Sequence, residues 1–220
     1  MTDQILVVAA HPDDEVLGCG GTLAKHVDSG DDVSILFLSD GETSRTSSDI
    51  LLRQEMARNA CLKLQVSELD FLSFPDNQMD QVPLLNIAKE IERKIATVKP
   101  SIVYTHWVGD LNVDHRICHQ AVHTACRPQP GCCVKKILCF EVRSSTEWGL
   151  MSEPLFAPNY HSDIEGYLSV KLVALSEYHS EMRAFPHTRS IEAIDALARH
   201  RGSAVGLEAA EAFVLTRAIA

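Results

Sequence analysis

Two kinds of apolar pattern alternate along the first two thirds of the chain. Short apolar runs rich in β-branched residues are typical of buried strands, and longer segments repeat apolar residues every three or four positions, as helices do. The short runs predict strands at residues 5–10, 33–38, 68–72, 101–105 and 136–142. The longer segments predict helices at residues 20–29, 49–62, 84–98 and 114–126.

This order of elements indicates the class of the fold. The segment at residues 84–98 is amphipathic, with leucine, isoleucine and alanine side chains on one face, and Pro100 ends it. Strands that alternate with helices of roughly 10–15 residues favour right-handed β-α-β units. We therefore expect an α/β protein with a mostly parallel sheet flanked by helices.

The last third of the chain is less regular. Residues 143–163 show little periodicity and are long for a plain connection, which predicts a functional loop. Residues 170–178 and 190–200 have helical spacing, and residues 212–215 predict a last strand. Because we find no repeat, low-complexity tract or linker, we expect residues 1–220 to form a single domain.

Composition and charge exclude several classes of protein. The net charge is −10 and there is no block of lysine and arginine, so neither nucleic acid nor an anionic membrane is expected as the main partner. The longest apolar runs reach about six residues, far short of the roughly 20 that span a membrane. No basic segment precedes the first apolar run, so we expect no signal peptide. Seven scattered cysteines, an odd number, indicate structural or incidental thiols and a cytoplasmic protein.

The first predicted strand is followed at once by residues that can bind a metal. His11 and Asp14 lie three positions apart across a turn that Pro12 begins, close enough to reach one ion, whereas Asp13 points elsewhere. Ligands bind at the carboxyl ends of strands in open α/β sheets. Capping of the following helix by the two aspartates is the alternative, but it leaves His11 unexplained.

The glycines at positions 18, 20 and 21 allow a different interpretation. A glycine-rich turn after a strand is typical of dinucleotide-binding proteins. Here the third glycine position of that pattern is Leu23, and the motif at residues 11–14 fills the place of the phosphate-binding turn. The pattern therefore disfavours a dinucleotide-binding protein.

A second cluster lies between the fourth predicted strand and the fourth predicted helix. His115, His119 and His123 follow one another every four residues and share one helix face. His115 with His119 has a known zinc-ligand spacing, so this pair competes with His115 alone. We favour His115 alone, because His119 lies about 6 Å further along the helix axis, away from the strand ends.

Two histidines and one aspartate with an open position suit hydrolytic zinc. The metal lowers the pKa of a bound water towards roughly 7 and polarises a carbonyl oxygen. Asp13, a free carboxylate beside the ligands, can take a proton from that water and return it to a leaving amine. The same ligand set also accepts Fe²⁺ or Co²⁺.

The motif His-Pro-Asp-Asp-Glu at residues 11–15, with Asp-His-Arg at residues 114–116, resembles the PIG-L/LmbE family of zinc-dependent N-deacetylases, in a bacterial branch. Residues 74–77, 141–148 and 210–213 resemble further patches of that branch. The resemblance implies a Rossmann-like, three-layer fold and hydrolysis of the N-acetyl group of an N-acetylglucosamine-type conjugate. It implies that His11, Asp14 and His115 bind the metal and that Asp13 is the general base. It also allows a homo-oligomer, a trimer or a hexamer.

One position departs from the family pattern. Better-known members carry a histidine three residues before the metal-binding histidine, and this chain has Asn112 there. An asparagine can donate a hydrogen bond to an oxyanion, a contact worth roughly 3–4 kcal/mol in known cases, but it cannot deliver a proton. We therefore expect Asp13 to make both proton transfers, or His106 or His187 to act as the acid. Capping of the fourth helix is the alternative role for Asn112.

The pattern also assigns further site residues. Asp114 is placed in the catalytic group and is also positioned to cap the fourth helix. Arg53 is assigned to a sugar hydroxyl or phosphate, Asp76 to sugar hydroxyls, and Arg143 to another polar group of the substrate. The alternatives are a solvated helix residue for Arg53 and an ordinary turn for Asp76.

These observations lead to one main prediction and two alternatives. The chain is predicted to be a metal-dependent amidohydrolase that deacetylates a small amino-sugar conjugate. An amidase of the same family acting on another acyl amide or a thiol conjugate is the first alternative. A metal-binding module without activity is the second.

Overall fold

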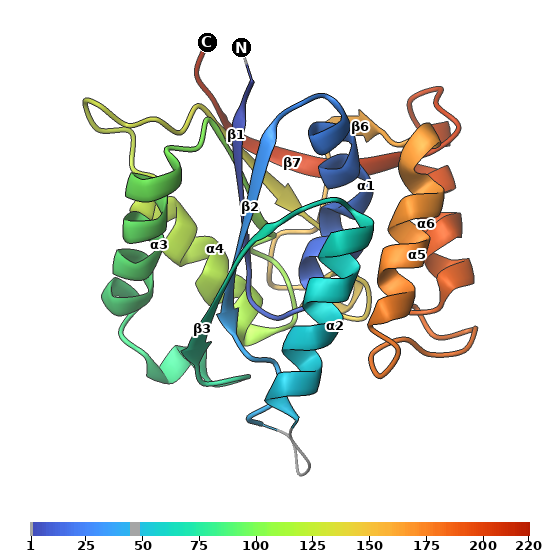
Figure 1. Ribbon diagram of the computed structural model, residues 1–220, viewed down its shortest axis with the longest axis horizontal. Coiled ribbons are helices and arrows are strands. Elements are labelled where there is room, and N and C mark those ends of the chain that lie inside the picture. The colour runs from blue at the N-terminus through green and yellow to red at the C-terminus, as the bar shows by residue number, and fades with distance from the viewer. Residues whose placement is uncertain (1, 45–48) are drawn as a thin grey trace.

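A computed structural model describes residues 2–44 and 49–220, and within these ranges seven strands form one sheet in the order β3-β2-β1-β4-β5-β7-β6 (Figure 1). The first five strands run parallel, whereas β7 is antiparallel to both β5 and β6. The strands are β1 Gln4–Ala9, β2 Asp32–Ser39, β3 Glu68–Phe74, β4 Ile102–His106, β5 Lys136–Phe140, β6 Tyr160–Asp163 and β7 Ala210–Ala218.

Helices cover both faces of the sheet and form the outer two layers. Helices α3 and α4 pack on one face, and α1, α2, α5 and α6 pack on the other (Figure 1). The helices are α1 Asp14–Asp28, α2 Ile50–Lys63, α3 Leu84–Val98, α4 Val113–Ala125, α5 Leu168–Glu177 and α6 Ile191–Ser203. Short 3₁₀ turns occur at Met79–Gln81, Thr146–Trp148 and Glu165–Tyr167. This three-layer arrangement confirms the predicted fold class.

The continuous apolar runs of the central strands follow from burial on two faces. In β1, Ile5 and Val7 belong to the core under α1 and α2, while Leu6 and Val8 belong to the core under α3 and α4. A strand buried on both faces needs apolar residues at every position, so it reads as an unbroken apolar run. Most predicted elements therefore match the observed ones within two residues, and α3 has its predicted bounds.

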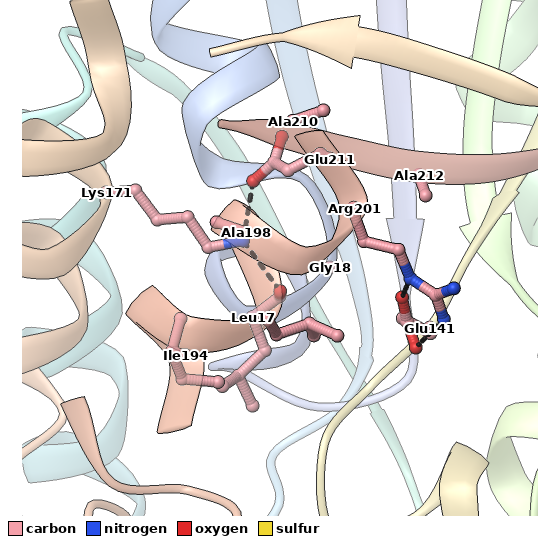
Figure 2. A pocket seen from close by; sticks show the side chains of 11 residues that line it. Leu17, Gly18, Glu141, Lys171, Ile194, Ala198, Arg201, Ala210, Glu211 and Ala212 are labelled. Carbon is pink, nitrogen blue, oxygen red and sulfur yellow. Dashed lines mark hydrogen bonds and ion pairs between the residues drawn. The ribbon is translucent and has the colours of Figure 1, made fainter. Parts of the chain in front are cut away.

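The first helix differs from its prediction, because α1 begins at Asp14 instead of residue 20 and is broken at Cys19 (φ −146°, ψ 16°). The break frees backbone groups that two buried side chains, Glu211 and Lys171, satisfy; Figure 2 shows the contacts of Lys171 with Leu17 and Glu211. The Glu211 carboxylate accepts the N–H groups of Gly21 and Thr22 at 2.9 and 2.7 Å. Lys171 donates to the Leu17 carbonyl at 2.9 Å and pairs with Glu211 at 2.6 Å.

Close packing explains the glycines at this break. A Cβ on Gly18 would lie 2.4 Å from a ring carbon of Phe140, and one on Gly21 would lie 2.9 Å from Ile164. The glycines thus let α1 approach β5 and the segment before α5, instead of forming a phosphate-binding turn. The consequence for the site is that Asp14 stands in the first turn of a short helical segment at the sheet edge.

The irregular segment at residues 143–163 contains more structure than its pattern predicts. It includes the 3₁₀ turn Thr146–Trp148 and ends in β6, which pairs with β7. The polar sequence Tyr-His-Ser-Asp of β6 carries no strand pattern, because all four of its residues are only partly buried at the sheet edge. The seven cysteines are free thiols. Among the described residues, no helix combines the length and the apolarity needed to cross a membrane.

Candidate metal centre and its pocket

Two adjacent parallel strands bring the predicted ligands together. Strand β1 leads into residues 10–13 and the start of α1, and β4 leads into residues 107–112 and the start of α4. Because β1 and β4 pair in parallel, both loops lie at the same edge of the sheet. The strand-end clusters predicted from the sequence therefore become neighbours.

His11, Asp14 and His115 form a buried cluster whose ligand atoms all lie within 4.8 Å of one another. Nε2 of His115 lies 3.4 Å from Oδ1 of Asp14, and Nδ1 of His11 lies 3.4 Å from Oδ2 of the same carboxylate. Neither Oδ1 of Asp14 nor Nε2 of His115 makes a hydrogen bond with the described residues. Buried polar atoms without partners are costly, so their convergence on one point fits a bound cation.

Carboxylates hold the opposite nitrogens of both histidines. Nε2 of His11 lies 3.0 Å from Asp114, and Nδ1 of His115 lies 3.1 Å from Asp110. The contact at His11 has hydrogen-bond geometry, whereas the one at His115 is a close approach only. A carboxylate beside one ring nitrogen favours the proton on that side, so that in the neutral ring the nitrogen facing Asp14 carries the lone pair. Asp110 is itself anchored by the hydroxyl of Thr146 at 2.6 Å. This is the environment in which metal-binding histidines are usually found.

Asp114 acts from behind His11 and does not line the pocket. Its carboxylate accepts the N–H groups of Asn77 and Met79 at 2.7 and 3.0 Å, so it ties His11 to the loop after β3. The expectation that Asp114 caps α4 is wrong. The helix begins one residue earlier, and the Asn112 side chain accepts the Asp114 N–H at 2.8 Å as the cap.

The charges of the centre favour a cation. Burial lowers the pKa of His115, but Asp14 and Asp110 raise it to about 9. Burial raises the pKa of Asp14, but the charge of His115 and the hydrogen bond from His11 bring it well below its usual range. Without a metal, protons therefore occupy the place where a positive ion would bind.

A polar pocket opens in front of the cluster. Its lining consists of His11, Asp13, Gly41, Arg53, Asp76, Asn77, Asn112, Glu181 and Arg189. The pocket is therefore lined by four of the predicted catalytic and substrate-binding residues: Asp13, Asn112, Arg53 and Asp76. Arg143 lies elsewhere, and its side chain lines a neighbouring cavity with Glu147 and Phe156.

Asp13 does not cap α1. It has φ 125°, a backbone conformation that is uncommon for a residue with a side chain, and its carboxylate makes no cap hydrogen bond. Instead Oδ2 lies 2.7 Å from Arg189 and 3.3 Å from Arg53. Burial raises the pKa of Asp13, and the two guanidinium groups lower it, with a net rise.

Arg53 is not a solvated helix residue, because it is 2% exposed. It lies 2.6 Å from Glu181 as well as near Asp13. Glu181 and Arg189 come from the segment between α5 and α6, and the sequence pattern did not identify them. No local signal marks them, since Asp13 and Arg53, which they contact in the pocket, lie more than a hundred positions earlier in the chain.

The remaining candidates take places outside the centre of the pocket. His106 lies behind it, stacked on His115 at 4.0 Å, and its Nε2 accepts the Ala10 N–H at 2.9 Å. Burial lowers the pKa of His106 well below its usual value, so it is a neutral structural side chain. His187 is exposed and packs edge-on against Trp148. His119 donates to the His106 carbonyl and is not among the ligands around Asp14.

Asp76 belongs to a second group that shares His11. Its Oδ1 lies 3.2 Å from Nε2 of His11, and with Asp114 the three residues could also hold an ion. Burial raises the pKa of Asp76, but hydrogen bonds from His11 and Ser44 bring it to about 2. His11 is therefore surrounded by carboxylates on both sides of its ring.

Comparisons with known proteins agree with this geometry. The PIG-L family model, described as GlcNAc-PI de-N-acetylase, matches residues 6–126. The deacetylase YaiS of Escherichia coli (strain K12), itself described as uncharacterized, is 32% identical over 80% of this chain and 90% of its own length. A probable N-acetyl-alpha-D-glucosaminyl L-malate deacetylase of Bacillus subtilis (strain 168) is 26% identical over 82% of this chain and 84% of its own.

A solved structure shows the same fold. The N,N'-diacetylchitobiose deacetylase from Pyrococcus horikoshii superimposes with a TM-score of 0.78 at 20% identity, over 97% of this chain and 83% of that one. The family match covers more than half of the chain and includes His11, Asp14 and His115. With a deacetylase relative above 30% identity over most of its length, this chain belongs to the PIG-L family of deacetylases.

Proposed function

We propose that the protein is a metal-dependent N-deacetylase that removes the acetyl group from a small N-acetyl amino-sugar conjugate. The observation that carries this proposal is the convergence of His11, Asp14 and His115 beside Asp13 in a polar pocket. The substrate class is supported by the relatives, whose descriptions name an N-acetylglucosaminyl malate and a diacetylated chitobiose.

His11, Asp14 and His115 would hold the metal, and two neutral imidazoles with one carboxylate suit Zn²⁺, with Fe²⁺ or Co²⁺ as substitutes. A cation there would supply Lewis acidity to a water molecule and to the amide carbonyl. Asp110 and Asp114 would keep the two histidines in the binding tautomer.

Asp13 would be the general base. It takes a proton from the attacking water as the carbon–oxygen bond forms, and it returns a proton to the nitrogen as the amide bond breaks, so that acetate and a free amine leave. Arg189 and Arg53 would orient its carboxylate through their contacts at Oδ2. No second acid is needed, which agrees with the positions of His106 and His187.

Asn112 would donate to the oxyanion. Because its Oδ1 accepts the Asp114 N–H, its Nδ2 must be the end that faces outward, where it donates to Asn77 at 3.1 Å. Capping and catalysis are therefore compatible roles for this side chain. Asp76 and Arg53 would contact the sugar, whereas Arg143 would reach only a conjugate that extends into the neighbouring cavity.

Replacement of the base tests the reaction. We expect Asp13→Asn to lower amine release from N-acetylglucosamine conjugates by roughly 10²–10⁴-fold, because the proton acceptor is lost. Bound metal, measured by elemental analysis, should stay at the wild-type level. Asp80→Asn, an exposed aspartate in the loop after β3, is the matched control and should keep full activity. Full activity of Asp13→Asn with metal bound would contradict the proposal.

A panel of substrates separates the alternatives. Release of amine only from longer acyl amides or thiol conjugates would identify the same-family amidase. Stoichiometric metal with no release from any amide would favour a metal-binding module, an outcome that the asparagine at position 112 makes worth testing.

A further inference from the structure

A second group of metal-binding side chains lies on the far part of α4. His119 and His123 follow His115 at one-turn intervals, and Cys139 of β5 faces them. One ligand atom from each of the three residues lies within 4.8 Å of the others. None of the three lines the pocket of the candidate metal centre.

The side chains of this group are already in contact. Sγ of Cys139 lies 3.6 Å from Nδ1 of His119, and the two histidine rings lie 4.3 Å apart. The hydroxyl of Thr216, on the neighbouring strand β7, lies 3.3 Å from Nε2 of His123 and 4.0 Å from Sγ of Cys139. Four potential donor groups from three elements thus meet between α4 and the sheet.

The surroundings also orient the first histidine. Nδ1 of His119 donates to the carbonyl of His106 at 2.9 Å, the kind of hydrogen bond that commonly fixes metal-binding histidines, and it leaves Nε2 of His119 as the nitrogen with a lone pair for a metal. Burial lowers the pKa of His119, and burial with the charges of His119 and Arg217 lowers that of His123 to about 4. Near neutral pH both imidazoles are therefore uncharged, so each ring keeps one nitrogen with a lone pair that can bind a metal.

The required movement is small. Zinc binds imidazole nitrogen at about 2.0–2.1 Å and thiolate sulfur at about 2.3 Å, so ligands around a tetrahedral ion lie roughly 3.3–3.6 Å apart. Separations within 4.8 Å can close to that range by side-chain shifts of about 1 Å. Both histidines are half-buried, so the group is reachable from solvent, whereas Cys139 is fully buried behind them.

We infer that His119, His123 and Cys139 form an accessory site for a borderline or soft divalent ion, Zn²⁺ in the first place. Two imidazoles and a thiol select such ions over Mg²⁺ or Ca²⁺, which prefer oxygen. Burial raises the pKa of the Cys139 thiol to about 12, so binding releases that proton to solvent as the metal–sulfur bond forms. The ion would tie α4 to β5 and stabilise the folded chain by mass action.

Cobalt is the probe for this site, because a thiolate ligand gives Co²⁺ a near-ultraviolet charge-transfer band that histidine and aspartate do not give. The titration uses the full chain carrying Cys132→Ser and Cys133→Ser, which removes the two partly exposed thiols. We expect the band in this background. We expect Cys139→Ser to abolish it and to bind one equivalent of Co²⁺ fewer.

Three further variants make the result specific. In His123→Ala, the Co²⁺ affinity measured from the band should fall at least tenfold. In His200→Ala, which replaces an exposed histidine of α6, the affinity and the band should be unchanged. His115→Ala should lose one equivalent but keep the band, which separates this site from the proposed active centre. Circular dichroism of the metal-free variants checks that each is folded. A background protein without the band, or a band that survives Cys139→Ser, would overturn the inference.

Discussion

At the scale of single residues, side chains that the sequence marks as chemical also serve as structural supports. Asn112 shows this most clearly, since one end of its amide caps α4 and the other faces the pocket. The sequence offered the helix cap and the oxyanion donor as competing roles, but an amide has two ends, so capping by Oδ1 is compatible with the proposed donor role of Nδ2. Asp114 does not face the pocket, because its carboxylate contacts Nε2 of His11 and accepts a backbone N–H from the loop after β3.

Asn112→Ala should lower kcat by roughly 10²–10³-fold, the usual effect of losing one oxyanion donor, with a much smaller change in KM. Steady-state amine release on a metal-loaded sample measures both constants. Asn112→His, which supplies the side chain of the family pattern, should keep most of the activity. An alanine variant with unchanged kcat would rule out the donor role and leave the cap alone.

Arg189 is the residue whose importance only the structure reveals. Arg189→Ala removes the closest charge partner of Asp13, at 2.7 Å, and should lower kcat roughly 10–100-fold, less than loss of the base itself. Arg189→Lys keeps the charge and should restore part of the rate. Arg183, an exposed arginine in the same segment, provides the control as Arg183→Ala. Equal losses in Arg189→Ala and Arg189→Lys would show that charge at this position is unimportant.

At the scale of elements, the start of α1 could not be predicted from the local residue pattern. The pattern predicts this helix from residue 20, whereas α1 begins at Asp14. The first segment, from Asp14, exists because Glu211 and Lys171 satisfy the backbone groups at the break from about 150 to 190 positions away. The parallel strands were predictable because burial on both faces requires an unbroken apolar run within each strand's own sequence.

The ion pair at this break should be important for stability. Glu211→Gln leaves Lys171 buried without its charge partner, so we expect a loss of about 3–5 kcal/mol in the free energy of unfolding. Urea unfolding followed by circular dichroism measures it. The double variant Glu211→Gln, Lys171→Met should lose less than Glu211→Gln alone, because it leaves no unpaired charge. Glu165→Gln, on the surface, is the control.

At the scale of the whole molecule, the sheet order decides which parts of the site were predictable. Parallel pairing of β1 with β4 brings two strand-end motifs to one edge, so His11, Asp14 and His115 could be grouped from sequence. The segment between α5 and α6 contributes Glu181 and Arg189 to the same pocket. The residue pattern of that segment does not predict this position. Asn112 is where this chain departs from the family pattern, so the pocket around it is where its substrate preference is to be sought.

The most direct test of the central claim is to measure bound metal and amine release on the same samples of wild type and His115→Ala. We expect the wild-type protein to bind zinc or iron at this centre and to release amine from an N-acetyl amino-sugar conjugate only when loaded. His115→Ala should lose one equivalent of metal and the activity together. A wild-type protein that takes up no metal after reconstitution, or a His115→Ala protein that still deacetylates at the wild-type rate, would contradict the account.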